Sequence, residues 1–316
     1  MDYKLNTETT QKWKTSNKMI KYTIHLILPL LLFMFSACNL NKMYLQPTEM
    51  KPDAKSATLY LEGDTVTINY IGEHYQPQFI RNGKDTVEFD YTIESTLFES
   101  TSGNLLNGWM LTPKDVKPKA TLLFFHGNAG FITSQHWSMT LLLKYGYQAF
   151  VIDYSGYGFS EGRATRKNVL KDGNSALNYI LNRPDVKGTD IVLYGQSLGG
   201  HLATVVAAQN QDKIDALVVE GAFSSHKDIG IHFAGFLGKI FVKEQYSAIE
   251  SVQQFNKPIL VIHSTEDNVV PFEMGKKIYD HANEPKAFYE IDGCHICGAR
   301  IYNKEIAQKI AKMIAQ

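Results

Sequence analysis

Six apolar runs of strand length recur in the chain from residue 121 onward. They are TLLFFHG (121–127), QAFVIDY (148–154), IVLYGQS (191–197), ALVVEGA (216–222), PILVIHS (258–264) and KAFYEID (286–292). Most are separated by stretches long enough to form a helix. Near-continuous apolar strands are typical of a parallel sheet covered on both faces, and right-handed crossovers then give a doubly wound α/β fold. Two earlier runs, residues 92–100 and 104–113, predict an antiparallel start to this sheet.

The charge balance excludes one broad class of function. The 316 residues include 32 Lys and Arg against 32 Asp and Glu, so the chain has no net field that would attract nucleic acid or another polyanion. Three cysteines are too few for a disulfide framework. Because Cys38 is far in sequence from Cys294 and Cys297, a zinc site with four cysteines is also excluded.

The N-terminal segment predicts export and attachment to a membrane. Residues 19–38, MIKYTIHLILPLLLFMFSAC, have a lysine-flanked start, an apolar core and small residues before a cysteine. The apolar core is short for a membrane span of about 20 residues and is typical of a secretion signal. Residues 36–38 resemble a bacterial lipoprotein processing site, in which Cys38 becomes the lipidated N-terminus; an uncleaved signal anchor is the alternative. Either places the folded part outside the cytoplasm, and Met19 is the better start.

Three segments are therefore expected: a leader and signal over residues 1–38, a linker with an added hairpin over 39–87, and one α/β domain over 88–316. The hairpin is expected from strand-like pieces at 58–70 and 78–91, with a turn at Asn82 and Gly83.

A candidate nucleophile lies between the third apolar run and a helix-like stretch. Residues 195–199, GQSLG, match the pattern G-x-S-x-G. The pattern alone is weak, but directly between a strand and a helix it places Ser197 on a sharp turn that needs small neighbours. The free N–H groups of the helix start can then face a developing oxyanion. A glycine-rich helix cap with a passive serine is the alternative.

A serine nucleophile needs a base and a carboxylate that orients the base. In such sheets their order along the chain is serine, acid, histidine. His295 follows the last strand run directly, whereas His281 is expected on the surface of a helix. Glu266 and Asp267 follow the run at 258–264, and spacing favours Asp267 slightly. A capping carboxylate is the alternative for either residue.

Residues 292–298, DGCHICG, could form a metal site, a redox pair, a haem anchor or part of a catalytic dyad. A haem anchor needs histidine directly after C-x-x-C, but Gly298 stands there. Zinc would need further ligands and would occupy the base. We expect His295 to be the base and both cysteines to be plain loop residues or a disulfide.

Residues 126–130, HGNAG, follow the first parallel strand, where this arrangement supplies a second oxyanion donor. The backbone N–H of Asn128 or Ala129 could pair with that of Leu198, and His126 is expected to orient the loop.

Five motifs in this order resemble the α/β-hydrolase superfamily, in particular its compact branch of serine aminopeptidase-like hydrolases and acyl-protein thioesterase-like membrane proteins. They are HGNAG, DYSGYGFSEG (153–162), GQSLGG (195–200), HSTEDNVVP (263–271) and GCH (293–295), and the match covers about Thr92 to the C-terminus. The resemblance implies an α/β-hydrolase fold with little or no cap domain and no cofactor or metal. It implies that Ser197 is the nucleophile, Asp267 the acid and His295 the base, with the oxyanion hole at Asn128, Ala129 and Leu198. Ser155 and Ser264 depart from the residues common in the family.

The segment between the fourth and fifth runs, residues 223–257, is long enough for one or two helices but not for a cap domain. Its part IGIHFAGFLGKIF (229–241) could be an acyl-chain groove, a membrane-facing flap or ordinary core packing, and we favour core packing. Carboxylic esters or thioesters are the expected substrates, with aminoacyl or peptide substrates second. A non-catalytic binding lipoprotein on a hydrolase scaffold is an alternative of a different class. The expected partners are the substrate and a membrane, not nucleic acid.

Overall fold

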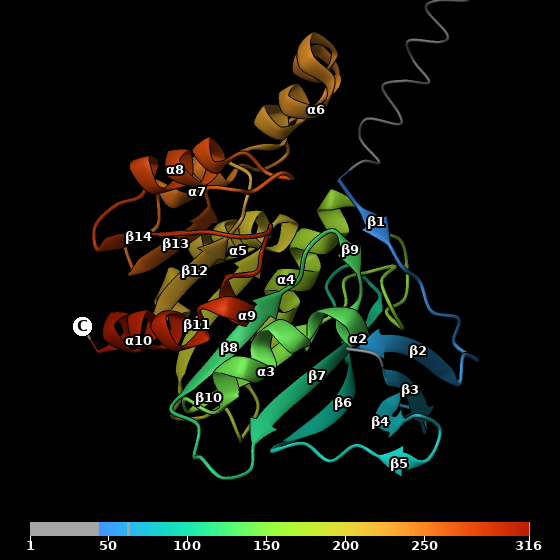
Figure 1. The fold of residues 1–316 in the computed structure, drawn as a ribbon. Coiled ribbons are helices and arrows are strands. Elements are labelled where there is room, and N and C mark those ends of the chain that lie inside the picture. The colour runs from blue at the N-terminus through green and yellow to red at the C-terminus, as the bar shows by residue number, and fades with distance from the viewer. Residues whose placement is uncertain (1–43, 62–63, 316) are drawn as a thin grey trace, which may run out of the picture. The chain divides into compact units, whose positions relative to one another are not determined.

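A computed structural model describes residues 44–61 and 64–315 of the chain, and its main sheet has eight strands (Figure 1). The strand order is β14-β13-β12-β11-β8-β10-β7-β6. β7 pairs antiparallel with β6 and β10, and all the other pairs are parallel. The strands are β6 (Tyr91–Glu99), β7 (Leu105–Pro113), β8 (Ala120–Phe125), β10 (Tyr147–Ile152), β11 (Asp190–Gln196), β12 (Ala216–Glu220), β13 (Ile259–Ser264) and β14 (Lys286–Ile291). The two predicted antiparallel strands and the six predicted parallel strands are confirmed.

Helices cover both faces of this sheet (Figure 1). One hydrophobic core joins the sheet to α4 (Arg166–Leu181), α5 (Leu198–Gln209), α7 (Ala248–Val252) and α8 (Phe272–His281). A second core on the other face includes residues of α3 (Trp137–Leu143), α9 (Gly298–Ile301) and α10 (Asn303–Ile314). The chain thus has the predicted doubly wound α/β architecture, because strands that are apolar on both sides require cover on both sides. Short elements complete it: α2 (Ile132–Gln135) and η1 (Gln211–Lys213).

The part of the chain before the main sheet contains more strand than the single hairpin expected for residues 39–87. β2 (Ser56–Leu61), β3 (Asp64–Ile71), β4 (Gln76–Arg81) and β5 (Asp85–Thr86) form an antiparallel sheet in that order. The turn at Asn82 and Gly83 is present, with φ of 49° and 70°. Tyr70 and Phe79 belong to the same core as Trp109 of β7, so this sheet packs on the main sheet. β1 (Gln46–Pro47) pairs with β9 (Ala129–Gly130).

α6 (His226–Phe241) follows β12 and extends away from the sheet in Figure 1. The helical backbone geometry is interrupted at Gly235, whose φ is 52°. Five large apolar side chains of α6 are exposed: Ile231, Phe233, Phe236, Leu237 and Ile240. The expectation that residues 229–241 pack in the core is therefore wrong for this face of the helix. The leader and Cys38 lie outside the described residues, and no helix within residues 44–61 and 64–315 is long and apolar enough to cross a bilayer.

Candidate active site

Ser197 occupies a strained turn between β11 and α5. Its φ of 55° and ψ of −118° are rare for a residue with a side chain. A Cβ on Gly195 would lie 2.2 Å from the Gly199 carbonyl oxygen, and one on Gly199 would lie 1.9 Å from the Phe125 carbonyl oxygen. Only glycine fits at these two positions, which explains the G-x-S-x-G pattern on either side of the serine.

Asp267 and His295 meet although 28 residues separate them in the sequence. Nδ1 of His295 lies 2.6 Å from Oδ2 of Asp267, whose carboxylate is fully buried. Oδ1 of Asp267 accepts hydrogen bonds of 2.8 Å from the amides of Val269 and Val270. Burial alone would raise the pKa of Asp267, but hydrogen bonds from His263 and His295 outweigh it and hold the pKa well below its usual range. The carboxylate is thus ionised and can orient the imidazole.

Two glycines show that Ser197 and the His295 loop come together. A Cβ on Gly127 would lie 3.7 Å from Cβ of Ser197 and 3.8 Å from Cδ1 of Ile296. A Cβ on Gly221 would lie 3.3 Å from the His295 ring. In the described part of the chain no hydrogen bond joins the Ser197 hydroxyl to His295, although the two residues share a site. Catalytic hydrogen bonds often form only when substrate is bound.

The loop after β8 reaches the same place. Gly127 lies against Ser197, whereas Asn128 and Ala129 continue toward β1. The Asn128 side chain accepts from the Gln46 amide at 2.7 Å, and its carbonyl accepts from the Tyr157 hydroxyl at 2.9 Å. Leu198 is the first residue of α5, where the amide has no acceptor within the helix. The structure places Gly127 directly against the serine turn, and the oxyanion role of Asn128, Ala129 and Leu198 stays a prediction.

His126 is buried beneath this loop, as expected for an orienting residue. Its Nδ1 lies 2.7 Å from the Gly127 carbonyl oxygen and its Nε2 lies 3.4 Å from Oδ1 of Asp153. His281 is exposed at the end of α8, where its Nδ1 lies 2.8 Å from the Lys277 carbonyl oxygen, in agreement with its expected surface position.

A buried carboxylate that the sequence analysis did not single out supports the His295 loop. Glu220, at the end of β12, is only 1% exposed. Its Oε1 accepts from the Gly298 amide at 2.6 Å, and its Oε2 accepts from the Tyr194 hydroxyl at 2.6 Å and the Gln196 amide group at 2.9 Å. One charged residue in the otherwise apolar run ALVVEGA was the signal that could have identified it.

Ser264 and Glu266 join the acid loop to the His295 loop. The Ser264 hydroxyl donates to the Gly293 carbonyl at 2.5 Å and accepts from the Glu266 amide at 3.1 Å. Oε2 of Glu266 accepts from the Gly293 amide at 3.0 Å. The two candidate acids thus differ in what they contact: Asp267 faces the imidazole and Glu266 faces the backbone. Ser264, which departs from the family pattern, contacts both loops.

Cys294 and Cys297 were expected to be either plain loop residues or a disulfide. Both are free cysteines, and the described residues contain no disulfide between them. The Cys297 thiol donates to the Cys294 carbonyl at 2.8 Å. Ile296 between them has a φ of 52°, an uncommon value for a β-branched residue. This backbone geometry turns the isoleucine toward Gly127 and Gly221 and leaves His295 beside Asp267.

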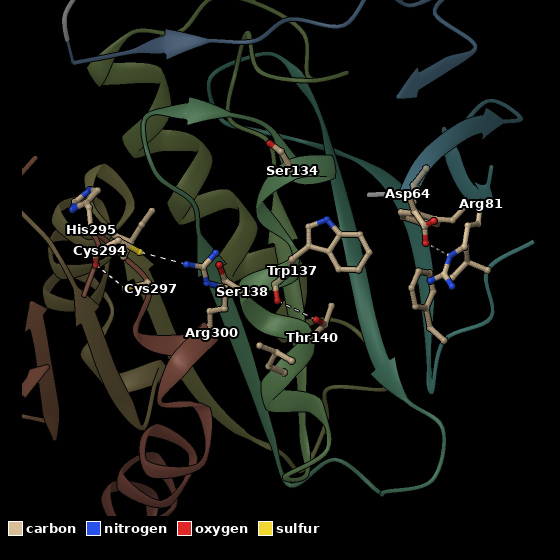
Figure 2. A pocket seen from close by; sticks show the side chains of 16 residues that line it. Asp64, Arg81, Ser134, Trp137, Ser138, Thr140, Cys294, His295, Cys297 and Arg300 are labelled. Carbon is tan, nitrogen blue, oxygen red and sulfur yellow. Dashed lines mark hydrogen bonds and ion pairs between the residues drawn. The ribbon is translucent and has the colours of Figure 1, made fainter. Parts of the chain in front are cut away.

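A cavity of about 840 Å³ reaches the His295 loop (Figure 2). Figure 2 shows His295 and Cys294 at one end, Asp64 and Arg81 at the other, and Trp137 between them. Aromatic residues line it, namely Phe79 of β4, Phe89 of the segment after β5 and Trp137 of α3. Neither Ser197 nor Asp267 is among its described lining residues, so it meets the candidate site only at the His295 loop.

Comparisons with known proteins agree with this fold. A family model described as serine aminopeptidase, S33, matches residues 116–250. A relative from Salmonella typhi, the uncharacterized protein YfhR, is 36% identical over 222 residues, which cover 64% of this chain and 74% of the relative.

Two solved esterases share the fold at low sequence identity. A structure of ferulic acid bound to Est1E from Butyrivibrio proteoclasticus has a TM-score of 0.61 at 19% identity and covers 70% of this chain and 100% of that chain. The Pyrococcus furiosus esterase Pf2001 has a TM-score of 0.60 at 16% identity, covering 71% of this chain and 91% of that chain.

Proposed function

Because the chain belongs to the α/β-hydrolase superfamily, we propose that it is a membrane-tethered serine hydrolase that cleaves carboxylic esters or thioesters through an acyl-enzyme on Ser197. The observation that carries the proposal is the 2.6 Å contact between His295 and the buried Asp267, at a site shared with a serine on a strained turn. Packing alone gives no reason for a serine at φ 55° or for a buried ion pair.

The reaction follows from the chemistry of the three side chains. Ser197 Oγ attacks the acyl carbon while its proton passes to Nε2 of His295, and Asp267 stabilises the imidazolium through Nδ1–H. Backbone amides at Leu198 and in residues 127–129 stabilise the oxyanion. His295 then returns the proton to the leaving alcohol or thiol as the bond to the acyl carbon breaks. Water repeats the sequence and releases the acid.

Active-site labelling tests this proposal against a non-catalytic role. A fluorophosphonate should modify the protein at Ser197 alone, as peptide mass spectrometry would show, and Ser197→Ala should remove the label. A protein that neither reacts nor hydrolyses any ester would instead fit a binding lipoprotein.

The second candidate is an aminopeptidase or amidase, which the description of the matching family model favours. A series of p-nitrophenyl esters of graded acyl length, compared with aminoacyl amides, separates the two activities. Higher kcat/KM for any aminoacyl amide than for every ester would replace the first candidate by the second.

The membrane part of the proposal rests on α6 and the N-terminal segment. Tyr44 packs at the base of α6, where its hydroxyl donates to the His226 carbonyl at 3.0 Å. Five residues lie between Cys38 and Tyr44, and the six steps from one to the other span at most roughly 22 Å at about 3.6 Å each. A lipid or anchor at Cys38 would therefore tether Tyr44, the start of the described chain, within that distance of the anchor.

The exposed side of α6 has the composition of an interfacial helix. Phe236 is 73% exposed and Phe233 and Ile240 are more than half exposed. Lys227 and Lys239 lie on the same helix, and its acidic residue Asp228 is paired with Lys277. Apolar side chains with nearby lysines favour an anionic lipid surface. Mass spectrometry of the N-terminal peptide tests the anchor: a lipidated Cys38 supports a lipoprotein, and an unmodified peptide running through Cys38 supports an uncleaved anchor.

A further inference from the structure

A second group of polar side chains lies where α6 meets α5, outside the candidate active site. His201 is on α5, His226 is the first residue of α6, and Glu244 follows α6. Both histidines are fully buried, and one ligand-type atom from each of the three residues lies within 4.8 Å of the others. No step of the proposed hydrolysis uses these residues.

Four atoms of this group lie close together. The carbonyl oxygen of Tyr246 lies 3.3 Å from Nε2 of His201 and 3.2 Å from Nδ1 of His226. Nδ1 of His226 lies 2.9 Å from Oε1 of Glu244. Tetrahedral zinc with bonds of about 2.0–2.2 Å holds its ligand atoms about 3.3 Å apart. These three separations, between 2.9 and 3.3 Å, are close to this value.

A neutral His201 cannot donate a hydrogen bond to both of the carbonyl oxygens that its ring nitrogens face. Its Nδ1 lies 3.0 Å from the Phe223 carbonyl and its Nε2 lies 3.3 Å from the Tyr246 carbonyl, and both partners only accept. A neutral imidazole donates from one nitrogen, so a lone pair of the other nitrogen faces an oxygen. An imidazolium would satisfy both carbonyls, but it would be a fully buried charge with no carboxylate in hydrogen-bond contact. A cation between Nε2 and the Tyr246 carbonyl removes the conflict.

We infer that this group is a structural zinc site. Its ligands are Nε2 of His201, Nδ1 of His226, the Glu244 carboxylate and the Tyr246 carbonyl. Two imidazoles with two oxygens suit Zn²⁺ better than Ca²⁺ or Mg²⁺, which prefer oxygen ligands throughout.

The surroundings of the ligands fit this assignment. Metal-bound histidines usually donate their other N–H to a carbonyl, and Nδ1 of His201 is placed to do so to Phe223, whereas Nε2 of His226 has no hydrogen-bond partner among the described residues. The Glu244 carboxylate accepts from the amides of His226 at 3.1 Å and Lys227 at 3.0 Å, which fixes its orientation. The Glu244 side chain is 26% exposed, which leaves a route for the ion.

A zinc ion at this site would hold α6 in place on α5, and this role does not depend on the proposed hydrolysis. Zinc would join the start of α6 and the segment after α6 to His201 of α5. His201 stands four residues after Ser197. Its loss should loosen α6 while the Asp267–His295 pair stays in place.

Metal content and cobalt spectroscopy of the full-length protein test the site. Protein purified without chelator should contain about one equivalent of zinc. After chelation, Co²⁺ should give the intense visible bands of a tetrahedral ion without a near-ultraviolet thiolate band, and Zn²⁺ should raise the melting temperature. Glu244→Gln preserves the shape and an acceptor oxygen, so it should fold yet bind Zn²⁺ at least 100-fold more weakly. His226→Gln should lose the cobalt bands.

Control variants show which residues bind the ion. His281→Gln changes an exposed histidine and should bind zinc as the unsubstituted protein does. Cys294→Ala with Cys297→Ala should also retain the metal. The inference is overturned if chelated protein shows no tetrahedral cobalt spectrum, if Glu244→Gln binds Zn²⁺ as tightly as the unsubstituted protein, or if the cysteine variant loses the ion. Ester hydrolysis measured on the same samples reports separately on the proposed function.

Discussion

The amide of Gly298 donates a 2.6 Å hydrogen bond to Oε1 of Glu220, a residue 78 positions earlier in the chain. The other oxygen of the same buried carboxylate accepts from Tyr194 and Gln196, next to Ser197. The strand that presents the nucleophile and the loop that presents His295 are therefore held by one side chain that contacts neither reacting atom. Glu220 is a positioning residue in this arrangement.

Replacing Glu220 by Gln should lower kcat while leaving KM for a small soluble ester nearly unchanged. The amide keeps the volume, but its NH₂ group must face at least one donor, so one hydrogen bond of about 1–3 kcal/mol is lost and the loop shifts. A roughly tenfold or larger loss in kcat is expected, because small displacements of a catalytic group are costly. Glu290→Gln, on the exposed side of β14, is the matched control. A Glu220→Gln enzyme that loses stability but keeps its kcat would reduce the residue to a purely structural role.

Ser197→Ala, His295→Ala and the double variant should lose similar amounts of activity. The members of a catalytic triad act as one unit, so losses of roughly 10⁴ to 10⁶ in turnover do not multiply. Steady-state hydrolysis of a p-nitrophenyl ester, with protein free of contaminating esterase, measures all three. Appreciable turnover by Ser197→Ala would exclude this serine as the nucleophile.

Asp267→Asn should lose far more activity than Glu266→Gln. Asp267 alone contacts the imidazole, and an amide there no longer stabilises the imidazolium, at a loss of roughly 10⁴ in kcat. Gln at 266 retains an oxygen that can accept from the Gly293 amide, so its loss should stay within tenfold. The opposite ranking of the two variants in the same ester assay would identify Glu266 as the acid.

The stability contributed by Asp267 should depend on pH in the acid range. Its pKa is lower in the folded protein than the value of about 3.9 expected when unfolded, so the folded state favours the ionised form. That stabilisation is complete above about pH 5 and is lost as the pH falls through 3.9 toward the folded value. Urea unfolding at pH 7, 5, 4 and 3 should show the difference between the unsubstituted protein and Asp267→Asn shrinking below pH 5. A difference that is constant to pH 3 would contradict the lowered pKa.

Local patterns in the sequence predicted the main sheet well, because each apolar run is itself the reason that its strand is buried. The same holds for the turn at Ser197, because the glycines that allow it stand two residues before and two residues after the serine. The role of Glu220 could not be predicted, since its partners lie on β11 and at the start of α9, both far from it in the sequence. The contacts of His201 and His226 are equally non-local.

The prediction that residues 229–241 of α6 pack in the core was wrong for a different reason. Apolar residues at helical spacing look alike whether they pack on a core or stand in solvent, so residues 229–241 gave no basis for choosing. Only the position of the helix, which extends away from the sheet, shows which side chains are left uncovered.

We expect that exposed face of α6 to insert into the bilayer. With full-length protein reconstituted in phosphatidylethanolamine and phosphatidylglycerol vesicles, a Phe236→Trp variant should gain tryptophan fluorescence that brominated lipids quench. Tyr60→Trp, at a position 82% exposed on the small sheet, is the matched control and should gain none. Quenching at both positions would mean non-specific adsorption. Absence of quenching at Phe236, in vesicles that retain the protein and its ester hydrolysis, would show that α6 does not contact lipid, and shielding of this tryptophan from iodide would then indicate that a second copy of the chain covers the helix instead.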